Sequence, residues 1–577
     1  MIHFLSPTEK KQPPPLLWFI LAIALLLRLY GIDFGMPELL HRDEPFEMHR
    51  ALKLACGSLD LDRAGKGGFY LLIFAELALS FILLLFFGRI ERISDFAIFY
   101  IRHEPAFYLG ARITSAIIGA ASVYLCYRIV SERATKRAAI IAATLLGGST
   151  LHTVSSHYAT VDTTLVLCLL AAWHFIFKSL DHSSRKNAAL AGVFGGLALV
   201  TKLHAAPIVL PMSLSIIAGS STDKRSLKKR GLLLLILFSC FTLTTFSLEP
   251  GYVRRLTNFE KTYNRLFAPP HNPIEAGATV TTAAPKGEVN LYGFYTNALK
   301  KEMGWLPLAA FFAATALSLF NRPRTTALLL SFAAPYFIII CSTSSPLYYP
   351  RYLLPIIPLI HMITAIGLDS ALAFIEKKTK NRALKIALST VFLVAIPWHP
   401  YMRSLAAAQK MANTFTQISA QRWIETHLQA GTPIHMEGQR EHRSQYDVPL
   451  LNSEKNIMEI IAALKYSNPG KARYWELRSR YLSTLSRPRY PLSFTPWDKP
   501  YPSLSSLRNA GAEYLIVDMA RMSGKKTSKI SPASRVSRAS FLRQLQSDPH
   551  AKMVLALPPK PAHGGPYLAI FELAKQP

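Results

Sequence analysis

The sequence LLWFILAIALLLRLYGIDFGMPELLHRDEP, residues 16–45, joins a long apolar run to an adjacent pair of acids. Residues 16–31 form a candidate membrane span, and Asp43 and Glu44 follow where a first extracytoplasmic loop should begin. Carboxylates at a membrane surface usually mark chemistry or ion handling. We therefore expect a membrane protein with a functional site at one membrane face.

The rest of the chain repeats the apolar pattern. Its 577 residues are 50% hydrophobic, the mean hydropathy is positive, and apolar runs of about 15–20 residues recur, which matches the span of a bilayer core. The sequence predicts an α-helical polytopic membrane protein with about 11 transmembrane helices. The expected spans are 16–31, 109–130, 138–154, 163–180, 188–202, 203–219, 231–248, 303–320, 325–342, 351–370 and 383–398.

Basic residues set the expected topology. With Lys10 and Lys11 in the cytoplasm, alternation of these spans places the basic loops 133–137, 178–186, 224–230, 322–324 and 377–382 on the same side. The apolar run 67–88 would invert this order if it crossed, so we expect a re-entrant or interfacial helix there. The net charge of +30 indicates anionic membrane lipids as partners, and no nucleic-acid motif is present.

Two domains are expected. Residues 1–400 form the transmembrane catalytic domain, with a first outer loop at 32–108, and residues 401–577 form a soluble extracytoplasmic α/β domain. Short strands are expected at 432–436, 513–517 and 567–573. The five cysteines are widely spaced, which supports neither a disulfide framework nor a paired-cysteine metal site.

Acidic residues occur at two of the expected outer turns. Asp43 and Glu44 precede a stretch with helical spacing, and Pro45 suits a first helical turn. Asp162 lies in the next outer turn, between the spans 138–154 and 163–180. For each acid taken singly, a role in stabilising a helix N-terminus explains it about as well as a role in catalysis. Their occurrence on one membrane face favours a shared cleft.

Cationic residues are expected on the same face. They are Lys66, Arg112, Lys202, His204 and Arg351, and any one alone is more often a side chain at headgroup level. Together they could hold a lipid-linked phosphate and stabilise it as a leaving group, while a carboxylate deprotonates an attacking hydroxyl. This combination fits glycosyl transfer from a polyprenyl phosphate.

An ordered set of motifs carries a family resemblance. The motifs are His41-Arg42-Asp43-Glu44-Pro45-Phe46, His49-Arg50-Ala51-Leu52, Gly57-Ser58-Leu59-Asp60, residues 110–116, residues 156–162, residues 195–202 and Pro350-Arg351-Tyr352-Leu353-Leu354-Pro355. Together they resemble the glycosyltransferase C superfamily, in the branch of protein O-mannosyltransferases and the lipid A aminoarabinose transferase. The resemblance covers roughly residues 15–400.

The resemblance implies roles for matching positions. Asp43 would be the general base, Glu44 would act in positioning or metal contact, and Asp162 would shape the acceptor site. The donor phosphate would be held by Arg112, Arg351, Lys66 and Lys202, and the neighbouring acceptor-side residues would be His157, Tyr158 and Tyr349. Gly67 and Gly68 follow Lys66 where the aminoarabinose branch has two prolines, so that match departs from the pattern. No cofactor is implied with certainty, although some relatives bind a divalent metal ion.

The expected function is therefore that of an integral-membrane glycosyltransferase of the cell envelope, using a polyprenyl-phosphate-linked hexose or pentose. The acceptor would be a hydroxyl on a lipid, a glycan or a protein, and the reaction would take place at the extracytoplasmic face of a bacterial inner membrane. A polytopic transporter or lipid flippase is the alternative, because it too would combine many spans with buried charges. The large outer loops and the charges gathered at one face favour the transferase.

Overall fold

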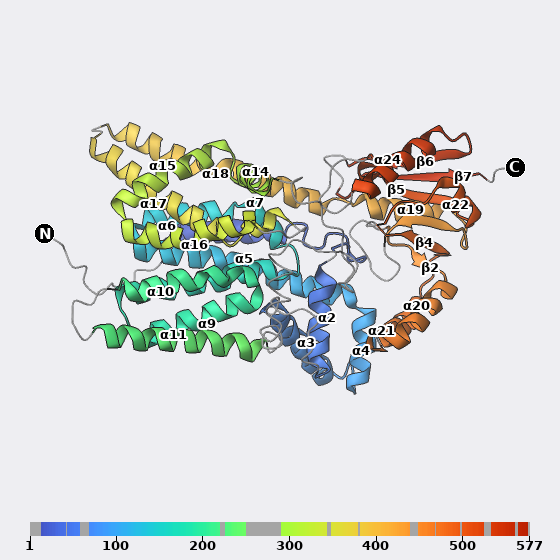
Figure 1. Ribbon diagram of the computed structural model, residues 1–577, viewed down its shortest axis with the longest axis horizontal. Helices are drawn as coiled ribbons and strands as arrows, with labels where there is room; N and C mark the ends of the chain where they lie inside the picture. The colour runs from blue at the N-terminus through green and yellow to red at the C-terminus, as the bar shows by residue number, and fades with distance from the viewer. Residues whose placement is uncertain are drawn as a thin grey trace.

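The protein consists of a long helical bundle and a C-terminal part built on a β-sheet, which lies beyond one end of the bundle in the computed structural model (Figure 1). The structure describes residues 13–41, 43–57, 68–219, 226–249, 290–342, 348–378, 381–438, 448–467, 469–496, 499–523, 532–559 and 564–574. Helices dominate these residues, as the sequence predicts.

Except for α14 (Leu291–Met303), the bundle helices lie roughly along the long axis of the molecule (Figure 1). They are α1 (Pro15–Leu29), α5 (Glu104–Arg133), α6 (Lys136–Gly147), α7 (Thr150–Ser155), α8 (Val161–Asp181), α9 (Arg185–Thr201), α10 (Val209–Ile217), α11 (Ser226–Leu248), α14 (Leu291–Met303), α15 (Trp305–Asn321), α16 (Pro323–Ser342), α17 (Ile357–Lys378) and α18 (Arg382–Ala412), with the 3-10 helices η1 (Leu203–Ile208) and η2 (Pro350–Leu353). Apolar side chains such as Trp173 of α8 and Ile363 of α17 fill the bundle core.

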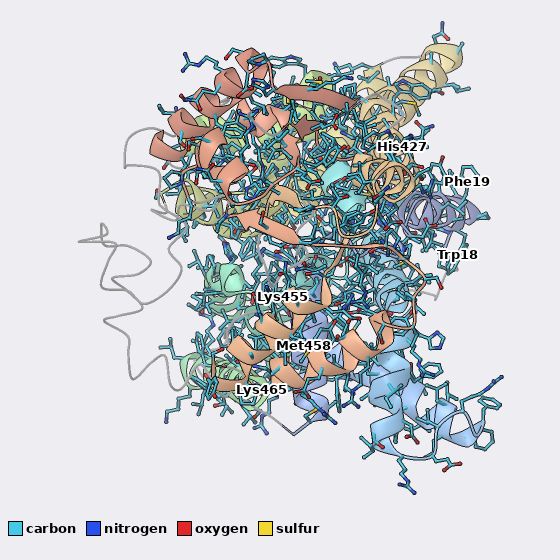
Figure 2. The ribbon with its side chains drawn as sticks, turned by 90° about the vertical axis from the view of Figure 1, so that its right-hand side faces the viewer. Trp18, Phe19, His427, Lys455, Met458 and Lys465 are labelled. Carbon is cyan, nitrogen blue, oxygen red and sulfur yellow. The ribbon has the colours of Figure 1, made fainter. Side chains whose placement is uncertain are left out.

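Large apolar side chains also cover the outside of the bundle. Trp18 and Phe19 project outward from α1 and are 58% and 62% exposed (Figure 2). In water such a surface would favour aggregation, whereas lipid chains match it. By contrast, α20 (Glu454–Ser467) of the C-terminal part presents the exposed Lys455 and Lys465 on its outer face (Figure 2). These surfaces fit a multi-pass membrane protein.

The expected number of about 11 spans is not confirmed. Among the described residues, six helices are long and apolar enough to cross a membrane, and up to seven if α14 and α15, which meet at a 104° bend, count as one span. Five of the six, α5, α8, α11, α16 and α17, coincide with expected spans. The expected span 138–154 is broken into α6 and α7. α1 has 15 residues and is too short to count among the six.

The sixth such helix is α3 (Gly68–Phe86), in the run for which the sequence predicts no crossing. Together with α2 (Glu44–Ala55) and α4 (Ile93–Arg102), it lies at the end of the bundle that is nearest the sheet (Figure 1). Phe69, Tyr70 and Ile73 of α3 pack with Met48 and Ala51 of α2 in a separate apolar cluster. Length and composition allow α3 to cross, while its place at the bundle end favours an interfacial helix.

Cysteine labelling from each side of the membrane can decide between these orientations. Cys56 is exposed at the end of α2, and Lys136 is exposed at the start of α6. If α3 does not cross, only α5 separates the two positions, and Cys56 and Lys136→Cys should react from opposite faces. Reaction of both from one face would show that α3 crosses. Exposed Lys455→Cys should react from the same face as Cys56 and serves as the reference.

The C-terminal part contains a five-stranded sheet in the order β4-β1-β5-β7-β6. β1 pairs in parallel with β4 and β5, and β7 is antiparallel to β5 and β6. Its strands are β1 (Ile434–Glu437), β4 (Leu492–Thr495), β5 (Tyr514–Asp518), β6 (Ala551–Leu557) and β7 (Leu568–Leu573); β2 (Leu451–Asn452) and β3 (Arg489–Tyr490) form a separate pair. The helices are α19 (Thr416–His427), α20 (Glu454–Ser467), α21 (Pro469–Leu482), α22 (Leu504–Asn509), α23 (Met519–Met522) and α24 (Pro532–Ser547).

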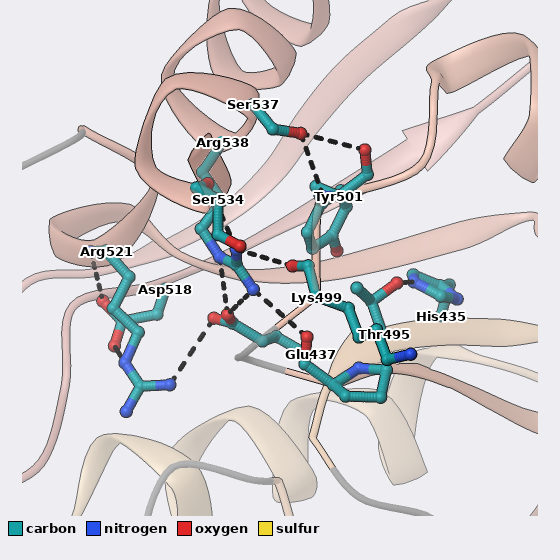
Figure 3. Close-up of polar contacts among 11 residues, drawn as sticks. His435, Glu437, Thr495, Lys499, Tyr501, Asp518, Arg521, Ser534, Ser537 and Arg538 are labelled. Atoms are coloured by element: carbon teal, nitrogen blue, oxygen red, sulfur yellow. Dashed lines mark hydrogen bonds and ion pairs between the residues drawn. The ribbon is translucent and has the colours of Figure 1, made fainter. Parts of the chain in front are cut away.

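A buried polar network fixes α24 to the sheet (Figure 3). Arg538 is fully buried, and its Nε donates to Glu437 Oε1 at 2.8 Å at the end of β1. The guanidinium also donates to the backbone carbonyl of Lys499 at 2.9 Å. Because a buried charge is costly unless paired, this network is needed to bury the helix against the strands. Its role is therefore structural.

Candidate active site

Four charged residues meet where helices end, at the sheet-facing end of the bundle. Asp43 is the N-cap residue of α2, and Asp162 lies in the first turn of α8. Lys202 is the C-cap residue of α9, and Arg351 lies in η2. The carboxylates are thus placed at helix N-termini, whose dipoles favour negative charge. Segments that are more than 300 positions apart in the sequence thus contribute side chains to one polar cluster.

The four side chains form a continuous row of ion pairs. Arg351 Nη2 donates to Asp43 Oδ2 at 2.7 Å, and its Nε lies 3.9 Å from Asp162 Oδ2. Lys202 Nζ donates to the other oxygen of Asp162 at 2.7 Å. Asp43 is 36% exposed, whereas Asp162 is 5% exposed, so the row runs from the surface into the bundle. Asp43 is therefore the carboxylate of the row that solvent reaches.

Aromatic rings support both cations. The Tyr349 ring lies 4.7 Å from the Arg351 guanidinium, and the Tyr352 ring lies 4.7 Å from Lys202 Nζ. Burial lowers the pKa of Arg351, but Asp162 and Asp43 outweigh that effect and raise the pKa above its ordinary value. The guanidinium therefore stays charged. The sequence analysis gave Tyr352 no role of its own. The signal is its spacing of three residues from Tyr349, which caps η2, because residues three apart lie on one side of a 3-10 turn.

Glu44 and Arg112 form a separate and fully buried pair. Arg112 Nε and Nη2 donate to the two Glu44 oxygens at 2.8 and 2.7 Å, and both side chains are 0% exposed. Arg112 Nη1 donates to the backbone carbonyls of Ile32 and Phe34, and Glu44 also accepts from the Ala159 amide at 2.9 Å. The sequence predicts a phosphate ligand at Arg112, but this geometry favours a structural role. α5 is oriented about its axis so that Arg112 points into the bundle. The spacing of residues in the sequence does not show this orientation.

Two of the three predicted acceptor-side residues, His157 and Tyr158, contact the segment that precedes Asp43. His157 is fully buried, with Nδ1 2.9 Å from the Thr153 carbonyl and Nε2 3.0 Å from the Tyr30 carbonyl. The Tyr158 ring stacks on His41, with ring centroids 4.0 Å apart. Burial lowers the pKa of His41, which favours the neutral ring in this stack. These contacts fasten the loop to the bundle, and an acceptor role for His157, Tyr158 and Tyr349 stays a prediction.

Two further predictions concern Lys66 and a bound metal ion. Lys66, a predicted phosphate ligand, lies outside the described residues. Within the part of the chain that the structure describes, no group of three or more His, Cys, Asp or Glu side chains is arranged to hold a metal ion. Asp43 and Asp162 each face a cation instead. The use of a divalent ion stays a prediction.

One protein-family model matches the chain. Residues 98–247 match the family described as dolichyl-phosphate-mannose-protein mannosyltransferase, which is 150 of the 577 residues. The matched segment includes Arg112, Asp162 and Lys202. This match confirms the resemblance to the glycosyltransferase C superfamily over these residues. Among curated proteins, none matches the chain.

Solved structures also match most of the length of this chain. ArnT from Cupriavidus metallidurans bound to undecaprenyl phosphate is 11% identical, with a TM-score of 0.46, and the match covers 96% of this chain and 97% of that one. The Archaeoglobus fulgidus oligosaccharyltransferase in its apo form is 12% identical, with a TM-score of 0.47 and coverages of 92% and 72%. The mycobacterial arabinofuranosyltransferase AftD is 14% identical, with a TM-score of 0.39 and coverages of 98% and 42%.

Proposed function

We propose that this multi-pass membrane protein is a glycosyltransferase that moves a sugar from a polyprenyl phosphate to a hydroxyl acceptor on a lipid, glycan or protein. The observation that carries the proposal is the row Asp43, Arg351, Asp162 and Lys202, which alternates carboxylates and cations at one end of an apolar bundle. The family match over residues 98–247 supports the same reaction class.

The proposed chemistry follows from these groups. Arg351 and Lys202 bind the donor phosphate, and their charges stabilise the negative charge that develops on it as the glycosidic bond breaks. Asp43 accepts the proton of the acceptor hydroxyl while the oxygen forms a bond to the anomeric carbon. The electron pair of the broken bond stays on the phosphate oxygen, so polyprenyl phosphate is the leaving group.

The arrangement suggests how the donor would enter. Arg351 pairs with Asp43 and Asp162, and Lys202 pairs with Asp162. A phosphate brings new charge-assisted acceptors for both cations, so Arg351 can leave Asp43 and free that carboxylate to act as the base. Asp162, being buried, keeps Lys202 in place and limits the room left for the acceptor.

The proposed placement puts this site and residues 401–577 outside the cytoplasm, at a bacterial inner membrane. The basic loops at the far end of the bundle support this orientation, because Arg133 and Arg137 lie there. In this arrangement the C-terminal part is a soluble α/β domain over the outer surface, and all the expected spans contribute to the bundle. The sugar can be a hexose or a pentose.

The reaction itself is the direct test. Purified protein in lipid vesicles would be incubated with a panel of polyprenyl-phosphate sugars and a mixture of hydroxyl acceptors, and free polyprenyl phosphate would be measured. Release that requires both protein and acceptor supports the transferase. Movement of the intact donor between leaflets without cleavage would identify a flippase and overturn the proposal.

Replacing Arg351 tests the phosphate site. Arg351→Ala should weaken donor binding by about 1.5–3 kcal/mol, the cost of a lost hydrogen bond to a charged group. Arg351→Lys should restore only part of it, because a point charge does not reproduce the planar fork of arginine. Donor affinity would be measured by equilibrium binding of a labelled polyprenyl-phosphate sugar.

A matched control exists at the other end of the bundle. Arg137 is also held by two carboxylates, with Nε 2.6 Å from Asp369 Oδ1 and Nη1 2.5 Å from Glu376 Oε1. Arg137→Ala should leave donor affinity unchanged. Equal affinity in wild type and Arg351→Ala would mean that the phosphate is held elsewhere.

A further inference from the structure

The loop that carries Asp43 has an unusual backbone. Between α1 and α2 it contains positive φ angles at Gly31 (78°), Gly35 (67°) and Leu39 (50°). The last is uncommon for a residue with a branched side chain, so the surrounding contacts must hold it. A Cβ at Gly31 would lie 2.6 Å from the Ala412 amide at the end of α18. The loop is therefore shaped by what packs around it.

The bundle holds one side of this loop. Arg112 Nη1 donates to the carbonyls of Ile32 and Phe34 at 2.9 and 3.0 Å. His157 Nε2 lies 3.0 Å from the Tyr30 carbonyl. These polar contacts all fall in residues 30–34. In the half of the loop nearer Asp43, the bundle adds the stack of Tyr158 on His41.

The C-terminal part supplies contacts to that other half. Arg487 Nη1 donates to Glu38 Oε1 at 2.8 Å, five residues before Asp43. The same guanidinium donates to Glu425 Oε1 of α19 at 3.0 and 2.6 Å, and to the Pro449 carbonyl at 3.1 Å. Glu38 is only 8% exposed, and Arg487 is 25% exposed. Arg487 thus joins the loop to two segments of the C-terminal part.

A second buried contact keeps the C-terminal part on the bundle. Arg478 of α21 donates to Glu104 Oε2 at 2.6 Å, at the first residue of α5, and both side chains are 10% exposed. Tyr474 of α21 donates to the other Glu104 oxygen at 3.1 Å. α21 ends at Leu482, five residues before Arg487, so this contact holds the segment that leads to Arg487 against the bundle, and precise positioning needs such a support.

We infer that Arg487 is a positioning residue for Asp43, so that the C-terminal part, through the Arg487–Glu38 ion pair, sets the geometry of the proposed base. The inference rests on the proposed function. A general base must lie within hydrogen-bond reach of the proton it accepts, and small displacements of such a group lower turnover strongly. Substrate binding depends on Arg351 and Lys202 instead, so loosening the loop should affect turnover more than donor affinity.

The test compares two arginines of the C-terminal part. Arg487→Met removes the ion pair to the loop, whereas Arg508→Met removes a similar pair, to Asp548 at 2.7 Å, that does not touch the loop. Arg487→Met should lower kcat about tenfold, with donor affinity within about twofold of wild type. Amide hydrogen exchange in residues 35–41 should become about tenfold faster, since the turn hydrogen bonds donated by the Met36 and Glu38 amides lose support. Arg508→Met should change none of these quantities.

A second variant protects the test against misfolding of the first. Glu38→Gln keeps the shape of the side chain but removes its charge, and should give a smaller change of the same kind. The double variant should be no worse than Arg487→Met alone, because the two residues act through each other. Additive effects, or equal exchange in Arg487→Met and Arg508→Met, would overturn the inference. If wild type releases no polyprenyl phosphate, the proposed function fails, and the exchange comparison alone decides whether Arg487 holds the loop.

Discussion

Asp43→Asn should lower turnover by roughly two to four powers of ten, the usual worth of a positioned general base, while donor binding stays near that of wild type. An acceptor hydroxyl is a poor nucleophile near neutral pH, so its proton must leave as the new bond forms. Asparagine has the same shape and can still accept a hydrogen bond from Arg351 through its amide oxygen. Turnover and donor affinity should be measured in one preparation.

The loop itself offers a matched control for this variant. Asp33 is exposed and lies in the same segment as Asp43, between α1 and α2. Asp33→Asn removes one acid from that segment without touching the row of ion pairs, and turnover should not change. If Asp43→Asn kept its turnover, Asp43 would leave the mechanism and Asp162 would become the better candidate. Because Asp162 is bound to Lys202, its own replacement should change donor binding as well.

The members of the proposed site could be predicted because each lies next to an apolar span. Asp43 follows the first expected span, Asp162 directly precedes one, Lys202 ends one and Arg351 begins one. Alternation of the spans assigns all four positions to the same face. This rule predicts that they share a face, and the structure brings them into contact. It does not predict how a helix is rotated about its axis. For that reason the sequence could not distinguish Arg112, which points into the core, from Arg351, which points to the row.

Other parts of the fold lacked a local signal. The expected strands at 432–436, 513–517 and 567–573 coincide with β1, β5 and β7, which have apolar, buried residues. β4 is as short as β1, but only its end residues Leu492 and Thr495 are buried, whereas all four residues of β1 are buried. β6 was missed because both its faces are partly exposed. The Arg487–Glu38 pair joins positions 449 apart, and no pattern in one sequence points to such a contact.

Glu44→Gln should destabilise the fold by about 3–5 kcal/mol, the cost of leaving a buried charge without its partner. The sequence alone predicts a milder, local effect, because it places Glu44 beside Asp43 as a second acid of the site. In the structure the carboxylate is 0% exposed and neutralises Arg112, and it also accepts from the Ala159 amide. Equilibrium unfolding in detergent micelles measures the loss.

Two comparisons test this explanation. Glu132→Gln breaks the exposed pair with Arg128 and should cost at most about 1 kcal/mol, as is usual for surface ion pairs. Glu44→Leu combined with Arg112→Met replaces both charges with apolar groups, and should be more stable than either single variant, since no unpaired charge remains. The carbonyls of Ile32 and Phe34 would still lose their donor, so recovery should be incomplete.

These predictions assign different roles to Asp43 and Glu44, two acids that are adjacent in the sequence. Loss of Asp43 should stop turnover in a stable protein, because that carboxylate is partly exposed and its place in the row can be taken by an amide. Loss of Glu44 should lower stability first and turnover as a consequence, since Glu44 and Arg112 fix both the start of α2 and the loop before it. A stable but inactive Glu44→Gln would contradict this division and place Glu44 in the chemistry itself.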